Sequence, residues 1–218
     1  MAARTKTGGA GRVIAGSARG RALLAPGEGT RPLGDRVKQT LFAILEPQIR
    51  GGAFLDLFAG SGAAGIEALS RGADRAVFVD RDADAVRTIE SNLVATRLRA
   101  RATVVHADAL KWLDGQGRRA GPFGAVIVDP PYDRIELLTA ALELIAGAEP
   151  GAAESPETIL GPDGTVVAKH FWKAEVPAEI GLLRSVRERR FGETALTFLR
   201  WASAGGESAG DSEDEEDR

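Results

Sequence analysis

The 218-residue sequence contains no cysteine and only two histidines, and both features restrict its chemistry. Without cysteine the chain forms neither a disulfide framework nor a thiolate metal site. His106 and His170 lie far apart in the sequence, and no pair of metal-ligating residues has the spacing of one helix face. A G-x-S-x-G nucleophile turn is missing as well. We therefore expect no bound metal and no covalent catalysis.

Long apolar runs are also missing. No stretch approaches the roughly 20 apolar residues of a membrane span. The basic, small-residue start of the chain, residues 1–11, lacks the apolar core of a signal peptide. A length of 218 residues with 44% hydrophobic content is typical of one globular domain with a small appendage. We expect a cytoplasmic protein with no membrane partner.

The net charge of −3 conceals a strong asymmetry along the chain. The first 40 residues carry eight basic residues against two acidic ones, whereas residues 203–218 carry seven acids against one arginine. A basic segment favours a polyanionic partner such as RNA, although a solvated basic face would have the same composition. The acidic tail has no core-forming residues, so we expect it to be disordered.

Beyond residue 50, short apolar runs alternate with helical patterns. Runs typical of buried strands occupy residues 54–58, 76–80, 102–105, 125–128 and 165–168. Apolar residues spaced three or four apart predict helices around residues 63–69, 86–93, 110–113 and 135–145. Two last strands are expected near residues 183–190 and 194–199. The alternation predicts an α/β fold with a Rossmann-like, doubly wound, mostly parallel sheet of seven strands.

The segment ahead of this sheet has its own pattern. Residues 13–16 and 21–24 predict a short hairpin. Residues 37–45 carry one apolar helical stripe, and we expect Pro47 and the following Gly-Gly pair to end that helix. Residues 147–162 are rich in glycine, proline and acids, and they predict a long surface loop.

The chain is organised around residues 54–65, which read F-L-D-L-F-A-G-S-G-A-A-G. A buried-strand pattern runs into a glycine turn that satisfies the G-x-G-x-x-G fingerprint, and Asp80 closes the next strand. At a nucleotide site, an ionised Asp80 would accept hydrogen bonds from ribose hydroxyls. Asp80 could instead cap the following helix. The loop alone is equally typical of a dinucleotide dehydrogenase.

Asp56, inside the first strand of the sheet, argues against a dehydrogenase. A buried carboxylate is costly unless it is paired. A cationic ligand, such as the ammonium or sulfonium of S-adenosylmethionine, would provide that pairing, whereas a pyrophosphate would be repelled. Asp56 could also accept backbone N–H bonds from the glycine loop, and the two roles are compatible.

The motif Asp129-Pro130-Pro131-Tyr132 directly follows the fourth strand. An exocyclic amine is a poor nucleophile because its lone pair is delocalised into the base. The Asp129 carboxylate and the Pro130 carbonyl are two acceptors that can orient such an amine. The two prolines fix φ and stiffen the turn, and Tyr132 offers a flat face for an extruded base. Alternatively, the motif is purely structural, a Pro-Pro turn followed by a surface tyrosine.

The acceptor chemistry of the motif bears on which base is modified. An ionised aspartate only accepts hydrogen bonds. Guanine presents adjacent N1–H and N2–H donors, whereas the amino group of adenine adjoins an acceptor. This favours guanine, and a methyltransferase acting on an adenine amino group of DNA or RNA is the alternative.

Four stretches together resemble a known family. They are G-R-V-I-A-G-S-A-R-G-R from residue 11, T-R-P-L-G-D-R-V-K-Q-T-L-F-A-I-L from residue 30, F-L-D-L-F-A-G-S-G-A-A-G-I-E-A-L-S-R-G-A from residue 54, and D-P-P-Y. The sequence resembles the RsmD-type 16S ribosomal RNA guanine-N2 methyltransferases, which are class I enzymes. It departs from them at Leu33, where the family usually has threonine, and at Lys169-His170, where we expect an acid.

The resemblance implies S-adenosyl-L-methionine as the cofactor and 16S rRNA, or an assembly intermediate of the small ribosomal subunit, as the partner. It implies that Asp56 and the glycine loop hold the methionine part, that Asp80 holds the ribose, and that Asp108 accepts from the adenine amine. Asp108 would alternatively cap the short helix that follows it.

The implied site residues fall into three groups. The cofactor group comprises Asp56, Phe58, Ala59, Gly60, Ser61, Gly62, Asp80, Arg81, Asp108, Ala109 and Asp129. The catalytic group comprises Asp129, Pro130, Pro131 and Tyr132. The substrate group comprises Arg12, Arg19, Arg21 and Arg31. The expected segments are a basic RNA-binding extension of hairpin and helix (1–50), a methyltransferase domain (51–202) and the acidic tail (203–218).

Overall fold

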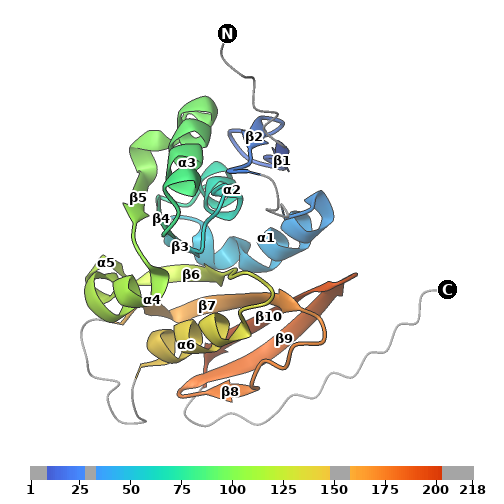
Figure 1. Cartoon of the computed structure of the whole chain (residues 1–218), viewed down its shortest axis with the longest axis vertical. Helices are drawn as coiled ribbons and strands as arrows, with labels where there is room; N and C mark the ends of the chain where they lie inside the picture. The colour runs from blue at the N-terminus through green and yellow to red at the C-terminus, as the bar shows by residue number, and fades with distance from the viewer. Residues whose placement is uncertain (1–8, 28–32, 148–157, 203–218) are drawn as a thin grey trace, which may run out of the picture.

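The computed structural model describes residues 9–27, 33–147 and 158–202, and an eight-stranded sheet forms its centre (Figure 1). The strand order is β5-β4-β3-β6-β7-β10-β9-β8. The bounds are β3 (Ala53–Leu57), β4 (Arg75–Asp80), β5 (Ala102–His106), β6 (Phe123–Val128), β7 (Leu160–Phe171), β8 (Glu179–Ile180), β9 (Leu183–Phe191) and β10 (Thr194–Trp201). Strands β3 to β7 pair in parallel, whereas β10 runs antiparallel to both of its neighbours. The predicted Rossmann-like fold is confirmed, and the two-residue β8 adds an unpredicted eighth strand.

Helices cover both faces of the sheet, as a doubly wound fold requires (Figure 1). One face packs against α1 (Asp35–Ile49), α2 (Ala63–Arg71) and α3 (Ala83–Thr96). The other packs against α4 (Ala109–Trp112) and α6 (Ile135–Ala146), with the short α5 (Arg118–Ala120) nearby. Side chains alternate along β3, so Phe54 joins the first core cluster, while Leu55 and Leu57 join the second. Among the described residues, no helix combines the length and apolarity needed to cross a bilayer.

The N-terminal hairpin differs from the prediction. It consists of β1 (Gly9–Arg12) and β2 (Ala22–Leu24), so residues 13–16 lie in the connection rather than in a strand. The reason is a long-range contact: Ile14 and Ala15 donate their backbone N–H groups to the buried carboxylate of Glu67 on α2, at 2.7 and 3.0 Å. Backbone amides that bond a side chain on a helix cannot also serve a strand ladder.

Two other boundaries differ from the prediction. Helix α1 continues through Pro47 and ends at Ile49, just before the Gly51-Gly52 pair, so the prediction was wrong for the proline and right for the glycines. A proline in the last turn removes a single hydrogen bond, and Ile49 remains fully buried. Strand β7 begins at Leu160, inside the predicted surface loop, because Leu160 is buried and pairs with Phe123 of β6. The two last strands lie where the sequence predicted them.

Candidate active site

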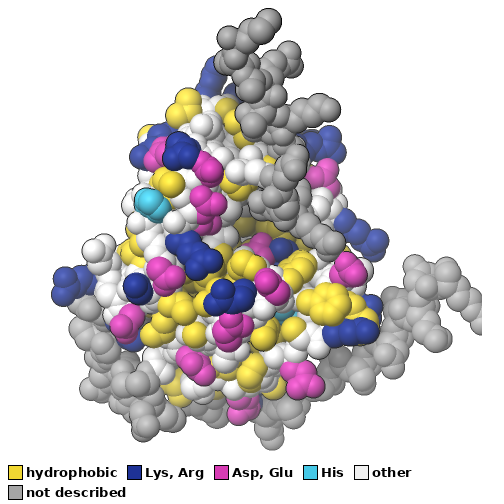
Figure 2. All heavy atoms as spheres, viewed as in Figure 1, with side chains coloured by type: hydrophobic (Ala, Val, Ile, Leu, Met, Phe, Trp, Pro, Cys, Tyr) yellow, Lys and Arg dark blue, Asp and Glu magenta, His cyan; other side chains and the backbone are white. Residues whose placement is uncertain are grey.

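A cavity of about 560 Å³ opens at the carboxyl ends of the parallel strands β3, β4, β6 and β7. This is where open α/β sheets bind ligands, and the volume lies in the range of small-molecule sites. Its lining includes the glycine loop after β3 and the D-P-P-Y turn after β6. Figure 2 shows hydrophobic side chains around a hollow near the middle of one face, with acidic and basic side chains interspersed about it.

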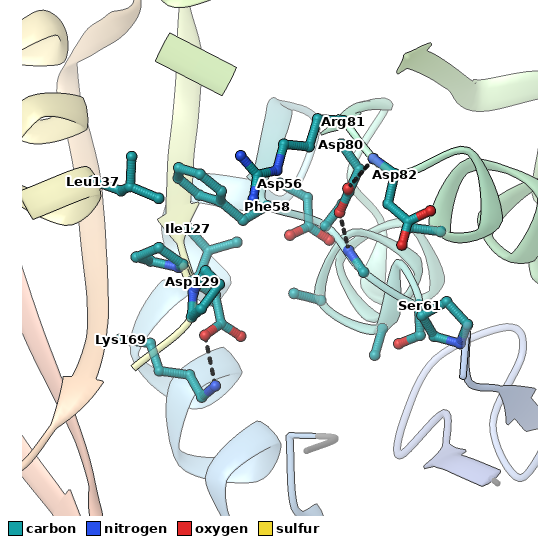
Figure 3. Close-up of a pocket in the computed structure, with 18 of the residues that line it drawn as sticks. Asp56, Phe58, Ser61, Asp80, Arg81, Asp82, Ile127, Asp129, Leu137 and Lys169 are labelled. Carbon is teal, nitrogen blue, oxygen red and sulfur yellow. Dashed lines mark hydrogen bonds and ion pairs between the residues drawn. The ribbon is translucent and has the colours of Figure 1, made fainter. Parts of the chain in front are cut away.

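The glycine loop is held in a tight turn by positive φ angles and by Asp80. Phe58, Gly60 and Gly62 have φ values of +59°, +54° and +74°. The backbone N–H of Gly60 donates to Asp80 Oδ2 at 2.8 Å. Positive φ is uncommon for a side chain as large as Phe58, and such strain clusters at ligand sites. Phe58, Ala59, Gly60 and Ser61 of this loop line the cavity, and Figure 3 shows Phe58, Ser61 and Asp80 around it.

Asp56 is a buried carboxylate in the wall of the cavity. It is 3% exposed, and its Oδ2 accepts from the backbone N–H of Gly65 at 2.9 Å. The predicted acceptance of a backbone N–H bond is confirmed, but the donor lies in the first turn of α2 and not in the glycine loop. Burial raises the pKa of Asp56 well above its ordinary value, the Gly65 hydrogen bond opposes that rise, and the charges of Asp129 and Asp80 add to it. A cation entering the cavity would stabilise the ionised form.

Two other carboxylates at the cavity have separate structural roles. Asp82, and not Asp80, caps α3 by accepting from the backbone N–H of Asp84 at 2.8 Å, so the capping alternative for Asp80 is wrong. Asp108 does cap α4, accepting from Leu110 and Lys111 at 3.1 Å each. Both Asp80 and Asp108 still line the cavity.

The D-P-P-Y turn is fixed at both ends. The backbone N–H of Asp129 donates to the carbonyl of Leu57 at 3.3 Å, which holds the turn beside β3. The hydroxyl of Tyr132 shares a 2.7 Å hydrogen bond with Thr194 Oγ1 on β10. All four residues of the motif line the same cavity as Asp56.

Lys169, at the end of β7, is a site residue that the sequence did not assign. Its Nζ donates to Asp129 Oδ1 at 2.6 Å (Figure 3). The same Nζ lies 4.8 Å from the centre of the Tyr132 ring. Burial raises the pKa of Asp129, and Lys169 opposes that rise. Burial alone would lower the pKa of Lys169, but the Asp129 charge reverses the effect and raises it. The lysine is therefore a permanent cation, unsuited to act as a base.

The structure brings most of the predicted site together. The predicted residues that line the cavity are Asp56, Phe58, Ala59, Gly60, Ser61, Asp80, Arg81, Asp108, Asp129, Pro130, Pro131 and Tyr132. Gly62 and Ala109 do not line it: Gly62 precedes α2, and Ala109 begins α4. The sequence missed Pro26 and Leu33 in the lining. Pro26 follows β2, which is bonded to α3 through Leu24 and Asn92.

Three of the predicted substrate arginines, Arg12, Arg19 and Arg21, lie on the N-terminal extension and do not line the cavity. Arg12 forms an ion pair with Asp35 at 3.0 Å, and Arg21 donates to the carbonyl of Ala95. Arg19 is exposed, and Arg31 lies outside the described residues. In the described ranges, no cluster of three or more ligating side chains could hold a metal ion.

Residues 11–200 match the protein family described as "Conserved hypothetical protein 95". The chain belongs to this family. It is 40% identical over 190 residues to "Putative rRNA methyltransferase YlbH" of Bacillus subtilis (strain 168), covering 87% of this chain and 98% of that protein. It is 44% identical over 124 residues to "Ribosomal RNA small subunit methyltransferase D" of Escherichia coli (strain K12), covering 56% and 61%.

The solved structures agree with the sequence relatives. The structure of yhhF from Escherichia coli superimposes with a TM-score of 0.75 at 30% identity, over 89% of this chain and 98% of that one. The resemblance to RsmD-type methyltransferases that the sequence motifs indicated is confirmed.

Proposed function

We propose that the protein transfers a methyl group from S-adenosyl-L-methionine to the exocyclic N2 of a guanine in small-subunit (16S) ribosomal RNA. One observation carries the proposal: Asp56, Asp80 and the D-P-P-Y turn face one cavity of about 560 Å³. Groups suited to a cationic nucleoside cofactor and groups suited to a base amine therefore share a single space. The names of the relatives support rRNA as the substrate class.

The residues present fit the proposed cofactor. Asp56 is buried beside the cavity and accepts a backbone hydrogen bond from Gly65. Because burial raises its pKa, a nearby cation such as the ammonium of the methionine part would stabilise its ionised form. Asp80 and Asp108 offer carboxylate oxygens that can accept from ribose hydroxyls and from the adenine amine. When bound, S-adenosyl-L-methionine supplies an electrophilic methyl group on a sulfonium. We assign the chemistry to residues 51–202 and RNA contacts to residues 1–50.

The D-P-P-Y turn would orient the base amine. Lys169 donates a hydrogen bond to Oδ1 of Asp129. The Asp129 side chain remains 24% exposed, and Asp129 lines the cavity. Its free lone pairs and the Pro130 carbonyl would accept the two amine hydrogens, which favours a more tetrahedral nitrogen. Tyr132 would stack on the extruded base. Orientation of this kind can account for roughly 7–11 kcal/mol of the barrier at best.

A second candidate substrate is an adenine amino group, and Lys169 is the observation that favours it. A donor beside an acceptor complements the N1 and N6 edge of adenine. Guanine is preferred because an ionised Asp129 also suits its adjacent N1–H and N2–H donors.

The test is methyl transfer from labelled S-adenosyl-L-methionine to small-subunit particles and naked rRNA from cells lacking this protein, followed by nucleoside mass spectrometry. We expect N2-methylguanosine, and the comparison of particle with naked RNA identifies the substrate form. Methylated adenosine would replace this proposal with the second candidate. No transfer to either RNA would contradict both.

A further inference from the structure

Strand β9 carries an excess of positive charge that the proposed site does not use. Its nine residues include Arg184, Arg187, Arg189 and Arg190 against a single acid, Glu188. Arg184 forms an ion pair with Glu179 at 3.0 Å. Among the described residues, no carboxylate lies within ion-pair distance of Arg187 or Arg189, and both are exposed.

Sheet register places these two arginines on the same face as the catalytic turn. Leu196 of β10 lies opposite both Lys169 and Arg189, so the three side chains project from one face. Arg187 follows on that face, opposite Phe198. Two strand spacings, roughly 10 Å, separate the backbone of Arg189 from that of Lys169. An RNA strand with one base in the cavity could therefore reach Arg189.

The lone acid of this strand does not neutralise that face. Glu188 alternates with Arg187 and Arg189, so it projects from the opposite face, where its carboxylate accepts from Thr197 Oγ1 at 3.2 Å. Arg187 and Arg189 are two residues apart on one strand, with a spacing of roughly 7 Å. Their like charges repel each other in the free protein, and a bound polyanion would relieve that repulsion.

The arginine pair is joined to the catalytic turn through β10. Thr194, which bonds the hydroxyl of Tyr132, lies opposite Phe191, at the end of the same strand as the arginines. The buried neighbours Leu196 and Phe198 belong to the core cluster that also holds residues of α1 and of the N-terminal hairpin. In Figure 1, β9 and that hairpin lie at opposite ends of the molecule, with α1 between them.

We propose that Arg187 and Arg189 bind backbone phosphates of the RNA strand adjacent to the target nucleotide. The inference rests on the proposed function and adds a second contact surface, separate from the N-terminal extension. Arginine forks match phosphate geometry, and such contacts position an RNA without reading its sequence. The surface therefore aligns the strand, while the cavity selects the base.

The test compares the double variant Arg187→Gln/Arg189→Gln with the control Arg184→Gln, which removes one charge from the same strand but from a paired position. Binding of the full-length protein to an unmodified small-subunit rRNA transcript is measured over a series of salt concentrations. Removal of one phosphate contact lowers the salt slope of log K by about 0.7 for single strands. We expect a decrease of about 1.4 in the double variant, no change in the control, and unaltered cofactor affinity in both.

A third variant, Arg187→Lys/Arg189→Lys, keeps the charges and should retain most of the slope, which separates the effect of charge from the effect of folding. Equal slopes in the double variant and the control would overturn the inference. The readout is independent of methyl transfer. If the salt slope falls in the double variant but the wild type forms no methylguanosine, the proposed function is refuted while the RNA-binding role of Arg187 and Arg189 is supported.

Discussion

The ammonium of Lys169 lies 2.6 Å from Oδ1 of Asp129, where Asp129 directly follows β6 and Lys169 lies near the end of the neighbouring parallel strand β7. Val128 pairs with Ala168 in the register of β6 and β7, so the next residue on each strand lies beside the other. The sequence had led us to expect an acid at Lys169-His170. An acid there would set two carboxylates together and raise the pKa of Asp129, whereas the lysine opposes such a rise.

The first prediction concerns Lys169→Met. Without the ammonium, burial alone acts on Asp129 and its pKa rises, so a higher pH is needed to ionise the amine acceptor. The acid limb of the pH profile of kcat should therefore move to higher pH. The free energy of unfolding should fall by roughly 3 kcal/mol, the low end of the range for removing one partner of a buried ion pair. Lys169→Arg, which keeps the charge, should return the limb toward its wild-type position. An unmoved limb in Lys169→Met would show that Asp129 does not titrate in the reaction.

The second prediction concerns Asp56→Asn, which keeps an acceptor for Gly65 but removes the charge. The folded-state pKa of Asp56 is raised from 3.8, so its stability contribution is complete below that value and is lost as pH rises through the raised pKa. Asparagine does not ionise, so the stability of the variant does not fall with pH in this way. Its Tm advantage over the cofactor-free wild type should grow from acid toward neutral pH.

The same variant should bind the cofactor poorly. Loss of a hydrogen bond to a charged group costs about 1.5–3 kcal/mol, or roughly 10- to 100-fold in affinity. S-adenosylmethionine and S-adenosylhomocysteine share the ammonium, so calorimetry should show both weakened alike. A loss confined to the methylated form would assign Asp56 to the sulfonium, and no loss would remove Asp56 from the site.

The third prediction separates the ring of Tyr132 from its hydroxyl. Tyr132→Phe and Thr194→Val each remove the same 2.7 Å hydrogen bond, so each should cost about 0.5–1.5 kcal/mol of stability with little change in transfer. Tyr132→Ala also removes the stacking face, worth about 1–3 kcal/mol per base. Its kcat/KM for RNA should fall correspondingly, at unchanged cofactor affinity. Equal rates in the alanine and phenylalanine variants would contradict a stacking role.

The fourth prediction concerns Asn92, which links the N-terminal hairpin to the glycine loop. Its buried side chain accepts from Leu24 N at 2.8 Å and donates to the carbonyls of Leu24 and Ser61 at 3.0 and 2.9 Å. Asn92→Ala leaves these backbone groups unpaired. The free energy of unfolding should fall by about 2 kcal/mol and Tm by roughly 4–8 °C. Cofactor affinity should fall with it, because the loop loses its anchor.

The matched control for this variant is the neighbouring Ser91→Ala. The Ser91 side chain is exposed and bonds the Arg87 carbonyl of its own helix. Its replacement should change the free energy of unfolding by less than about 0.5 kcal/mol. Similar Tm shifts in the two variants would mean that Asn92 does not couple hairpin and loop.

The parts of the fold and site that were predictable depend on local signals. The strand that contains Asp56, the glycine turn and D-P-P-Y are contiguous patterns, and their physical meaning does not depend on the rest of the chain. Lys169 was not predictable as a partner of Asp129 in this way, because their contact depends on strand register across 40 residues. The one available signal in the sequence was that Lys169-His170 stands where we expected an acid.

The errors have the same origin. The local pattern of residues 13–16 predicted a strand. Two of their backbone amides instead donate to Glu67, which lies on a helix some 50 residues later. Leu160 was assigned to a surface loop, but it is buried and pairs with Phe123 of β6, a contact that no local pattern shows. Tertiary contacts therefore decided the positions where local patterns failed.

The central claim is that Asp129 orients a guanine amine in a cavity shared with the cofactor. It is tested most directly by single-turnover transfer to small-subunit RNA with wild-type protein, Asp129→Asn and Asp129→Ala, alongside cofactor affinities. We expect N2-methylguanosine from the wild type, with transfer at least about 100-fold slower in both variants when each is saturated with cofactor. Near-wild-type rates in both variants, or methylated adenosine as the product, would contradict it.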